Sequence, residues 1–160
     1  MVTFTIVHVL ISLAGILTGI VVMLGLLANR RLDGWTAIFL LTTLATGVTG
    51  FFFPFHRLLP SHIIGILSLI TLAFAIMARY GFHLAGAWRR TYVITAMLPL
   101  YFNVFVLVVQ LYRKAPALNA LAPTQTELPF MLTQLAALVA FVILTILAAK
   151  RFRGGPYHAA

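Results

Sequence analysis

The chain has 160 residues, of which 62% are hydrophobic and only 8% charged, and its formal net charge at pH 7 is +9. About a quarter of the residues in an ordinary soluble domain are charged, so this composition excludes a soluble globular protein. The basic residues lie at the ends of apolar segments rather than in one block, which argues against nucleic-acid binding.

Five apolar segments follow one another along the chain, at residues 4–27, 35–54, 61–80, 91–112 and 129–150. A helix needs about 20 apolar residues to cross the hydrocarbon core of a bilayer. The segments are continuous apolar runs without alternation, which excludes a β-barrel, and lipid then requires helices to pair every backbone group. We therefore predict an all-α polytopic membrane protein, in which residues 1–160 form a single transmembrane domain, a bundle of five transmembrane helices.

The ends of the segments predict the topology. The first segment lacks a basic start and a small-residue cleavage pattern, so we expect a retained span rather than a signal peptide. With the N-terminus outside, three cations lie outside, namely Arg57, Arg113 and Lys114. Eight lie inside, namely Arg30, Arg31, Arg79, Arg89, Arg90, Lys150, Arg151 and Arg153. Because cytoplasmic loops carry the excess of Lys and Arg, we predict an N-out, C-in orientation.

Polar residues recur on one face of the segments and gather toward their outer ends. His8 and Ser12 are one helical turn apart in the first segment, and Asn103 and Gln110 are seven residues apart in the fourth. Polar side chains in lipid are costly unless they face the bundle interior. We therefore predict a polar ligand pocket in the outer half, lined by His8, Ser12, His56, His62, Asn103, Gln110 and Gln134. The alternative is structural: small residues allow close packing, and amides hydrogen-bond across helices.

Three of the five histidines, His8, His56 and His62, are predicted at the same outer depth on three helices. Two imidazoles on facing helices are able to ligate haem b, and Arg57, Arg113 and Lys114 are candidate contacts for its propionates. The absence of cysteine excludes thiolate ligation, covalent c-type haem and disulfides. The alternative for these histidines is an ordinary interfacial role, and the metal, if any, stays unknown.

The sequence argues against an enzyme. No Asp or Glu falls inside a predicted span, so no pair of carboxylates is available for general acid and base catalysis. Ser12 and His8 are one turn apart, but no third group orients them, and no glycine-rich phosphate loop occurs. We name no catalytic residue.

Several runs carry a resemblance to a known family. They are GFFFPFHRLLPSHIIGILSL (Gly50–Leu69), ARYGFHLAGAWRRTYVITA (Ala78–Ala96), NVFVLVVQ (Asn103–Gln110) and LAPTQTELPF (Leu121–Phe130). Over the whole chain, the sequence resembles uncharacterised small multi-span inner-membrane proteins of proteobacteria. The resemblance implies a multi-pass protein of the bacterial cell inner membrane and no assigned activity. A looser likeness links the chain to small membrane proteins of the cytochrome b561 type, which hold haem through histidine pairs within their spans.

We therefore expect a small, non-enzymatic membrane protein that binds a partner protein or a lipid-like ligand through the outer pocket and the PTQTELPF loop. Its expected partners are the lipid bilayer and another membrane protein or a second copy of the chain. One alternative is an electron-transfer subunit that carries haem b and exchanges electrons with quinone. A second alternative is a small-solute transporter or channel.

Overall fold

The structure is a computed structural model that describes residues 2–53 and 60–154, the side chains of residues 60 and 61 excepted. The described residues form helices and no strand, which confirms the all-α prediction. The helices are α1 (Val2–Leu27), α2 (Asp33–Gly50), α3 (Pro60–Ile76), the π-helical turn η1 (Met77–Gly81), α4 (Trp88–Lys114), α5 (Pro116–Leu121) and α6 (Leu128–Arg151).

Four helices of the described chain are long and apolar enough to cross a membrane: α1, the His62–Gly81 helix, α4 and α6. The remaining long helix, α2, has 18 residues but is more polar, because it begins with Asp33 and carries a series of threonines. These threonines donate their hydroxyls to carbonyls of their own helix, as Thr42 does to Ile38 at 2.8 Å and Thr46 does to Thr42 at 2.9 Å. The count of five crossings therefore stays a prediction.

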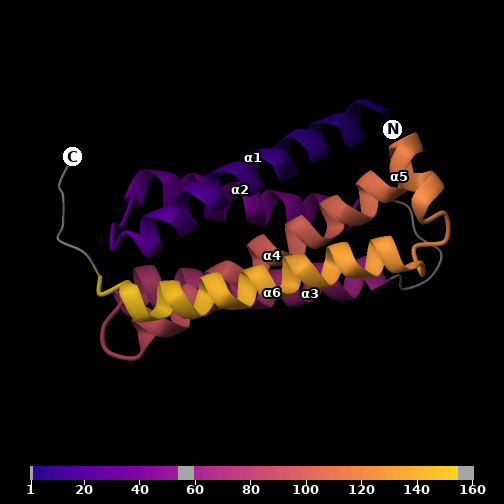
Figure 1. Ribbon diagram of the computed structural model, residues 1–160. Coiled ribbons are helices and arrows are strands. Elements are labelled where there is room, and N and C mark those ends of the chain that lie inside the picture. Colours follow the sequence, from indigo (N-terminus) through magenta and orange to yellow (C-terminus); the bar gives the residue numbers. More distant parts are fainter. Residues whose placement is uncertain (1, 54–59, 155–160) are drawn as a thin grey trace.

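The helices run side by side in one elongated bundle (Figure 1). Helices α1 and α2 pack together as an antiparallel hairpin, and α4 packs against α1, α3 and α6. Helix α4 is thus the central element. The connection between the fourth and fifth predicted segments contains the short helix α5. Sequence reasoning missed this helix, although Pro116 occupies a first-turn position that favours helix initiation.

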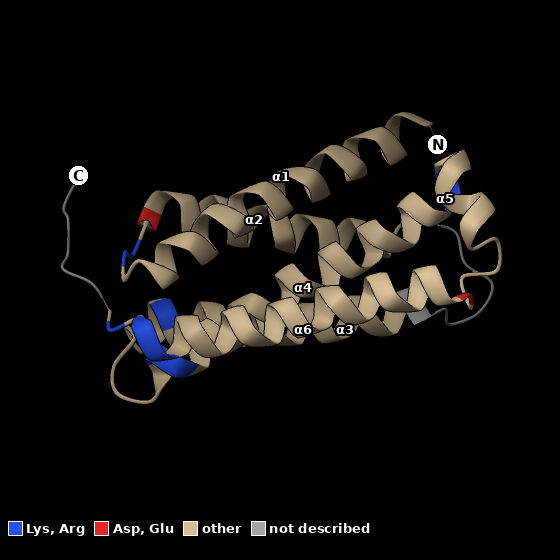
Figure 2. Cartoon of the chain, viewed as in Figure 1, with Lys and Arg blue, Asp and Glu red and all other residues tan. Residues whose placement is uncertain are grey.

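The hydrophobic core fills one half of the bundle. It lies where α1 and α6 end and where α2 and α4 begin, and its fully covered side chains include Val22, Leu26, Phe39, Leu72, Tyr92, Val93, Met97, Leu100 and Phe152. We call this half the basic half, because eight lysines and arginines cluster at its end, and the opposite one the α5 half. Figure 2 shows the accumulation of basic residues at that end.

The core is closed toward the α5 half by a close approach of three helices at Gly19. A Cβ atom at this position would lie 2.5 Å from Cδ1 of Leu100 on α4 and 2.8 Å from Cε2 of Phe39 on α2. Both side chains are fully buried, so neither can move aside without disturbing the core. A residue without a Cβ is therefore required for α1 to approach α2 and α4 this closely.

A buried ion pair joins the helices at the basic end. The guanidinium of Arg79 in η1 is 1% exposed, its Nη2 pairs with Oδ1 of Asp33 at the start of α2, and it also donates to the carbonyl of Arg31 at 3.3 Å. Its cationic carbon lies 5.2 Å from the centre of the Tyr92 ring, within the range of a cation–π interaction. The sequence analysis counted Arg79 only among the cations predicted inside, and did not predict that its side chain is buried.

We predict that Gly19→Val lowers the free energy of unfolding by about 1–3 kcal/mol, the usual cost of overpacking a core. The matched control is Gly34→Ala, because no described atom lies within 4 Å of a Cβ at that position. We expect the control to change stability by less than about 0.5 kcal/mol. Unfolding in mixed detergent micelles, followed by circular dichroism, measures both. Equal losses in the two variants would show that the contact at Gly19 is not the cause.

We also predict that Asp33→Asn lowers the free energy of unfolding by about 2–3 kcal/mol, because it leaves a buried guanidinium without its counter-charge. Asp33 itself is 54% exposed, which places the loss below that of a fully buried pair. The double variant Asp33→Asn/Arg79→Met should recover more than half of the loss, and a double-mutant cycle measures the coupling. A single variant as stable as the wild type would contradict this role of the pair.

Candidate functional site

The polar residues predicted to line the pocket come from four helices in the α5 half. His8 and Ser12 lie on α1, His62 on α3, Asn103 and Gln110 on α4, and Gln134 on α6. His56 and Arg57, also predicted at this site, lie outside the described residues. The structure divides the described members among three helix contacts.

The first contact joins α1 and α2 near their ends in the α5 half. Nδ1 of His8 is 2.8 Å from Oγ1 of Thr49, and the His8 ring meets the Phe53 ring edge-on at 5.1 Å. Because Thr49 donates its single hydroxyl hydrogen to the carbonyl of Ala45 at 2.6 Å, His8 donates from Nδ1 and keeps a lone pair on Nε2. Ser12 donates to the carbonyl of His8 at 2.8 Å, so its hydroxyl stays within α1.

Deeper along the same face of α1, Gly15 faces polar side chains of α2 and α4. The position of a Cβ at Gly15 lies 3.4 Å from Oγ1 of Thr42, 3.4 Å from Oγ1 of Thr43 and 3.7 Å from Nδ2 of Asn103. Among the described residues, Oγ1 of Thr43 and Nδ2 of Asn103 have no hydrogen-bond partner, although both atoms are buried. Thr43 and Asn103 therefore bring two unused polar groups to one point between three helices.

The second contact lies on another side of α4, against α6. Gln134 donates from Nε2 to the carbonyl of Phe105 at 3.2 Å, and its buried Oε1 has no partner in the part of the chain that the structure describes. Closer to the loop, the Tyr112 hydroxyl lies 2.9 Å from the Thr133 hydroxyl and 3.2 Å from the carbonyl of Pro129. The amide of Gln134 thus binds the α4 backbone rather than the side chains on α1.

His62 occupies the third contact, near the start of α3. It is 7% exposed, and its ring centre lies 6.0 Å from that of Phe51, which directly follows α2. His8 packs against Phe53, two residues further along the same segment. Within the described residues, no group of three His, Cys, Asp or Glu side chains is placed to hold a metal ion. Arg113 and Lys114, the predicted propionate contacts, are both exposed at the end of α4.

The burial of residues on the central helix α4 decreases where the hydrophobic core ends. In its first half, α4 buries Tyr92, Val93, Ala96, Met97, Pro99 and Leu100. From Tyr101 to Gln110 every residue is half-buried and none is buried, although α4 still lies between its neighbours. The helices therefore cover α4 incompletely along the ten residues that carry Asn103 and Gln110.

The α5–α6 connection is ordered by the only glutamate of the chain. Oε1 of Glu127 accepts from the amide and hydroxyl of Thr124 at 3.1 Å and 2.8 Å, and Oε2 accepts from the amide of Thr126 at 3.1 Å. Slight desolvation raises the pKa of Glu127, but these hydrogen bonds outweigh it, so its pKa lies below the ordinary value. This compact turn is the PTQTELPF segment that the sequence analysis assigned to partner binding.

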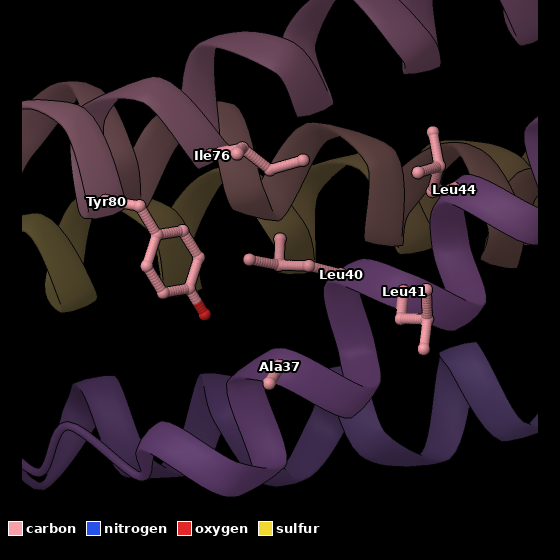
Figure 3. A pocket seen from close by; sticks show the side chains of 6 residues that line it. All are labelled: Ala37, Leu40, Leu41, Leu44, Ile76 and Tyr80. Atoms are coloured by element: carbon pink, nitrogen blue, oxygen red, sulfur yellow. The ribbon is translucent and has the colours of Figure 1, made fainter.

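Two grooves occur away from the predicted pocket. One, of about 190 Å³, lies between α2 and η1 and is lined by Ala37, Leu40, Leu41, Leu44, Ile76 and Tyr80. In Figure 3 the Tyr80 ring reaches across toward α2. The other, of about 300 Å³, lies along the last turns of α1. Sequence reasoning found neither groove, because both depend on how far neighbouring segments are apart.

Comparisons with protein-family models, with curated proteins and with solved structures found no match to this chain. The resemblance to small inner-membrane proteins therefore stays a prediction.

We predict that Thr124→Val raises the pKa of Glu127 toward its ordinary value, because it removes a hydrogen bond to the ionised carboxylate. A carboxyl whose folded pKa is lowered stabilises the fold above its unfolded pKa and loses that effect as the pH falls through the folded pKa. Carbon-13 NMR of the carboxyl groups measures the change, since the chain has only two acidic residues. Thr71→Val is the control, because its hydroxyl bonds within α3. A pKa unchanged by Thr124→Val would contradict the assigned network.

Proposed function

We propose that the chain crosses the bacterial cell inner membrane five times, with its N-terminus outside and its C-terminus inside. Helix α2 supports a fifth crossing because it packs along α1 as a hairpin between the two ends of the bundle. Its 18 residues extend about 27 Å, close to the hydrocarbon thickness of about 30 Å. Eight cations at the basic end against Arg113 and Lys114 in the described part of the opposite end support the orientation.

Within that membrane, we propose that the protein is a non-enzymatic binding protein, and that the α5 half receives a partner protein or a lipid-like ligand. The observation that carries this proposal is the incomplete cover of α4 between Tyr101 and Gln110. In lipid, a polar group without a partner costs free energy, and Nδ2 of Asn103 and Oε1 of Gln134 are two such buried groups, on different sides of α4. An added molecule that reaches either of them, where the helices part locally, would remove that cost.

The two acidic residues support a binding role rather than catalysis. Asp33 is engaged by Arg79 and Arg31 at the basic end, and Glu127 is engaged by Thr124 and Thr126 in the loop. The face that carries His8, Ser12 and Asn103 therefore has no carboxylate among its described contacts to act as a general base.

The packing at Gly19 argues against the transporter alternative. On the side of Asn103 toward the basic half, Phe39 and Leu100 fill the interface of α1, α2 and α4, and both are fully buried. A solute entering along the polar face of α1 would meet this closed core. Passage would require separating the best-packed part of the bundle.

The test is to purify the protein in a mild detergent and to measure by mass spectrometry the lipid, small molecule or protein that stays bound per chain. We predict that Asn103→Leu retains about five- to tenfold less of it, the effect of losing one hydrogen bond of about 1–1.5 kcal/mol. We also predict that this variant unfolds no more readily than the wild type, because its amide nitrogen has no described partner to lose.

Thr71→Val serves as the matched control, since it removes a hydroxyl that bonds only to its own helix. A wild-type protein that is free of bound molecules and takes up no component of a membrane extract would refute the proposal. The haem b alternative is favoured by the free lone pair on Nε2 of His8, with His62 or His56 as the second ligand. An absorption spectrum of the same preparation tests it, because a sample without a Soret band from haem-replete cells excludes haem.

A further inference from the structure

An apolar groove beside an unpaired arginine lies at the basic end of α1. Four of its lining residues, Val21, Leu24, Gly25 and Ala28, are spaced by three, one and three residues and share one face of the helix. Leu32 and Arg30 from the following loop complete the lining, and the groove measures about 300 Å³. Leu24 is 56% exposed, so this face of α1 points away from the core.

The loop that closes the groove is held in a defined conformation. Helix α1 ends with Asn29 in the left-handed region at φ 55°, and the amide of Arg30 donates to the carbonyl of Gly25 at 2.7 Å. This pattern is a helix C-cap that turns the chain sharply back. Leu32, at φ 45°, places its side chain against Gly25, where a Cβ would clash with it. The backbone of Arg30 is thereby fixed at the end of the groove.

The charge of Arg30 is not compensated within the described chain. The single acidic residue at this end is Asp33, whose Oδ1 already pairs with Arg79 and Arg31. Glu127 lies at the opposite end of the bundle. Arg30 is exposed and takes part in none of the described ion pairs, so an anion at the mouth of the groove would meet a free guanidinium.

The dimensions suit one lipid chain. From Val21 to Ala28 the groove follows α1 for about 10 Å, at 1.5 Å per residue. One leaflet of the hydrocarbon core is about 15 Å deep, half of the total thickness. A phospholipid whose acyl chain lies along Val21, Leu24 and Ala28 therefore has its phosphate at the level of Arg30. A guanidinium binds phosphate oxygens with paired hydrogen bonds.

We propose that this groove is a binding site for one anionic phospholipid, with an acyl chain along α1 and the phosphate on Arg30. The groove between α2 and η1 provides the contrast, because it is apolar and no cation is among its lining residues. It holds acyl chains without selecting the headgroup. The proposal concerns the basic half and does not depend on ligand binding in the α5 half.

The test is a titration of the full-length, delipidated protein in detergent with dioleoylphosphatidylglycerol or dioleoylphosphatidylcholine, with bound lipids counted by native mass spectrometry. We expect one phosphatidylglycerol to bind with higher affinity than phosphatidylcholine. Arg30→Gln should weaken phosphatidylglycerol binding about fivefold, the effect of one interfacial cation worth about 1 kcal/mol. Ala28→Phe should weaken binding of both lipids at this site by filling the groove.

Two matched variants separate this site from the general charge and apolarity of the protein. Arg113→Gln removes a cation at the opposite end, and Leu41→Phe fills the other groove, so neither should change phosphatidylglycerol binding. Equal affinity of wild type and Arg30→Gln, or an equal loss in Arg113→Gln, would overturn the proposal. Displacement of the lipid by inorganic phosphate would overturn it as well, because it would show a site for a free anion rather than for a lipid.

Discussion

The close approach of α1, α2 and α4 at Gly19 is the constraint on which the rest of the structure depends. It brings Phe39 of α2 and Leu100 of α4, both fully buried, directly against α1. In the basic half, large apolar side chains are completely covered. In the α5 half, the same helices carry hydroxyls, amides and imidazoles, and α4 is covered only in part.

Electrostatics at the basic end follow from the scarcity of acidic residues. One carboxylate, that of Asp33, faces eight cations, and the structure commits it to the guanidinium that is removed from water. Burying Arg79 without a counter-charge would be costly, whereas exposed cations are solvated at low cost. Of the remaining cations, Arg31 also pairs with Asp33, whereas exposed ones such as Arg30 take part in none of the described ion pairs. The proposed orientation and the proposed lipid site thus draw on the same excess of cations at this end.

The polar side chains of the α5 half illustrate what periodicity is able to predict. Spacing along α1 placed His8 and Ser12 on one face, because α-helical geometry is known in advance. Spacing alone did not show that Thr49 is the partner of His8, or that Gln134 binds the α4 backbone across a different contact. The π-turn η1 and the burial of Arg79 were also missed, since the signal was a single Arg after an apolar run. Composition also did not indicate that Oγ1 of Thr43 and Nδ2 of Asn103 are buried without a described hydrogen-bond partner.

The sequence by itself determined the helical architecture and the presence of helices long and apolar enough to cross a membrane, because long apolar runs leave a lipid-embedded backbone no other way to satisfy its amides and carbonyls. It also determined which end of each helix carries the charge. Tertiary structure alone decided which helix is central, where the core stops and which polar atoms lack a partner. These properties depend on distances between residues far apart in the chain, such as Gly19 and Leu100, and local periodicity contains no information about such distances.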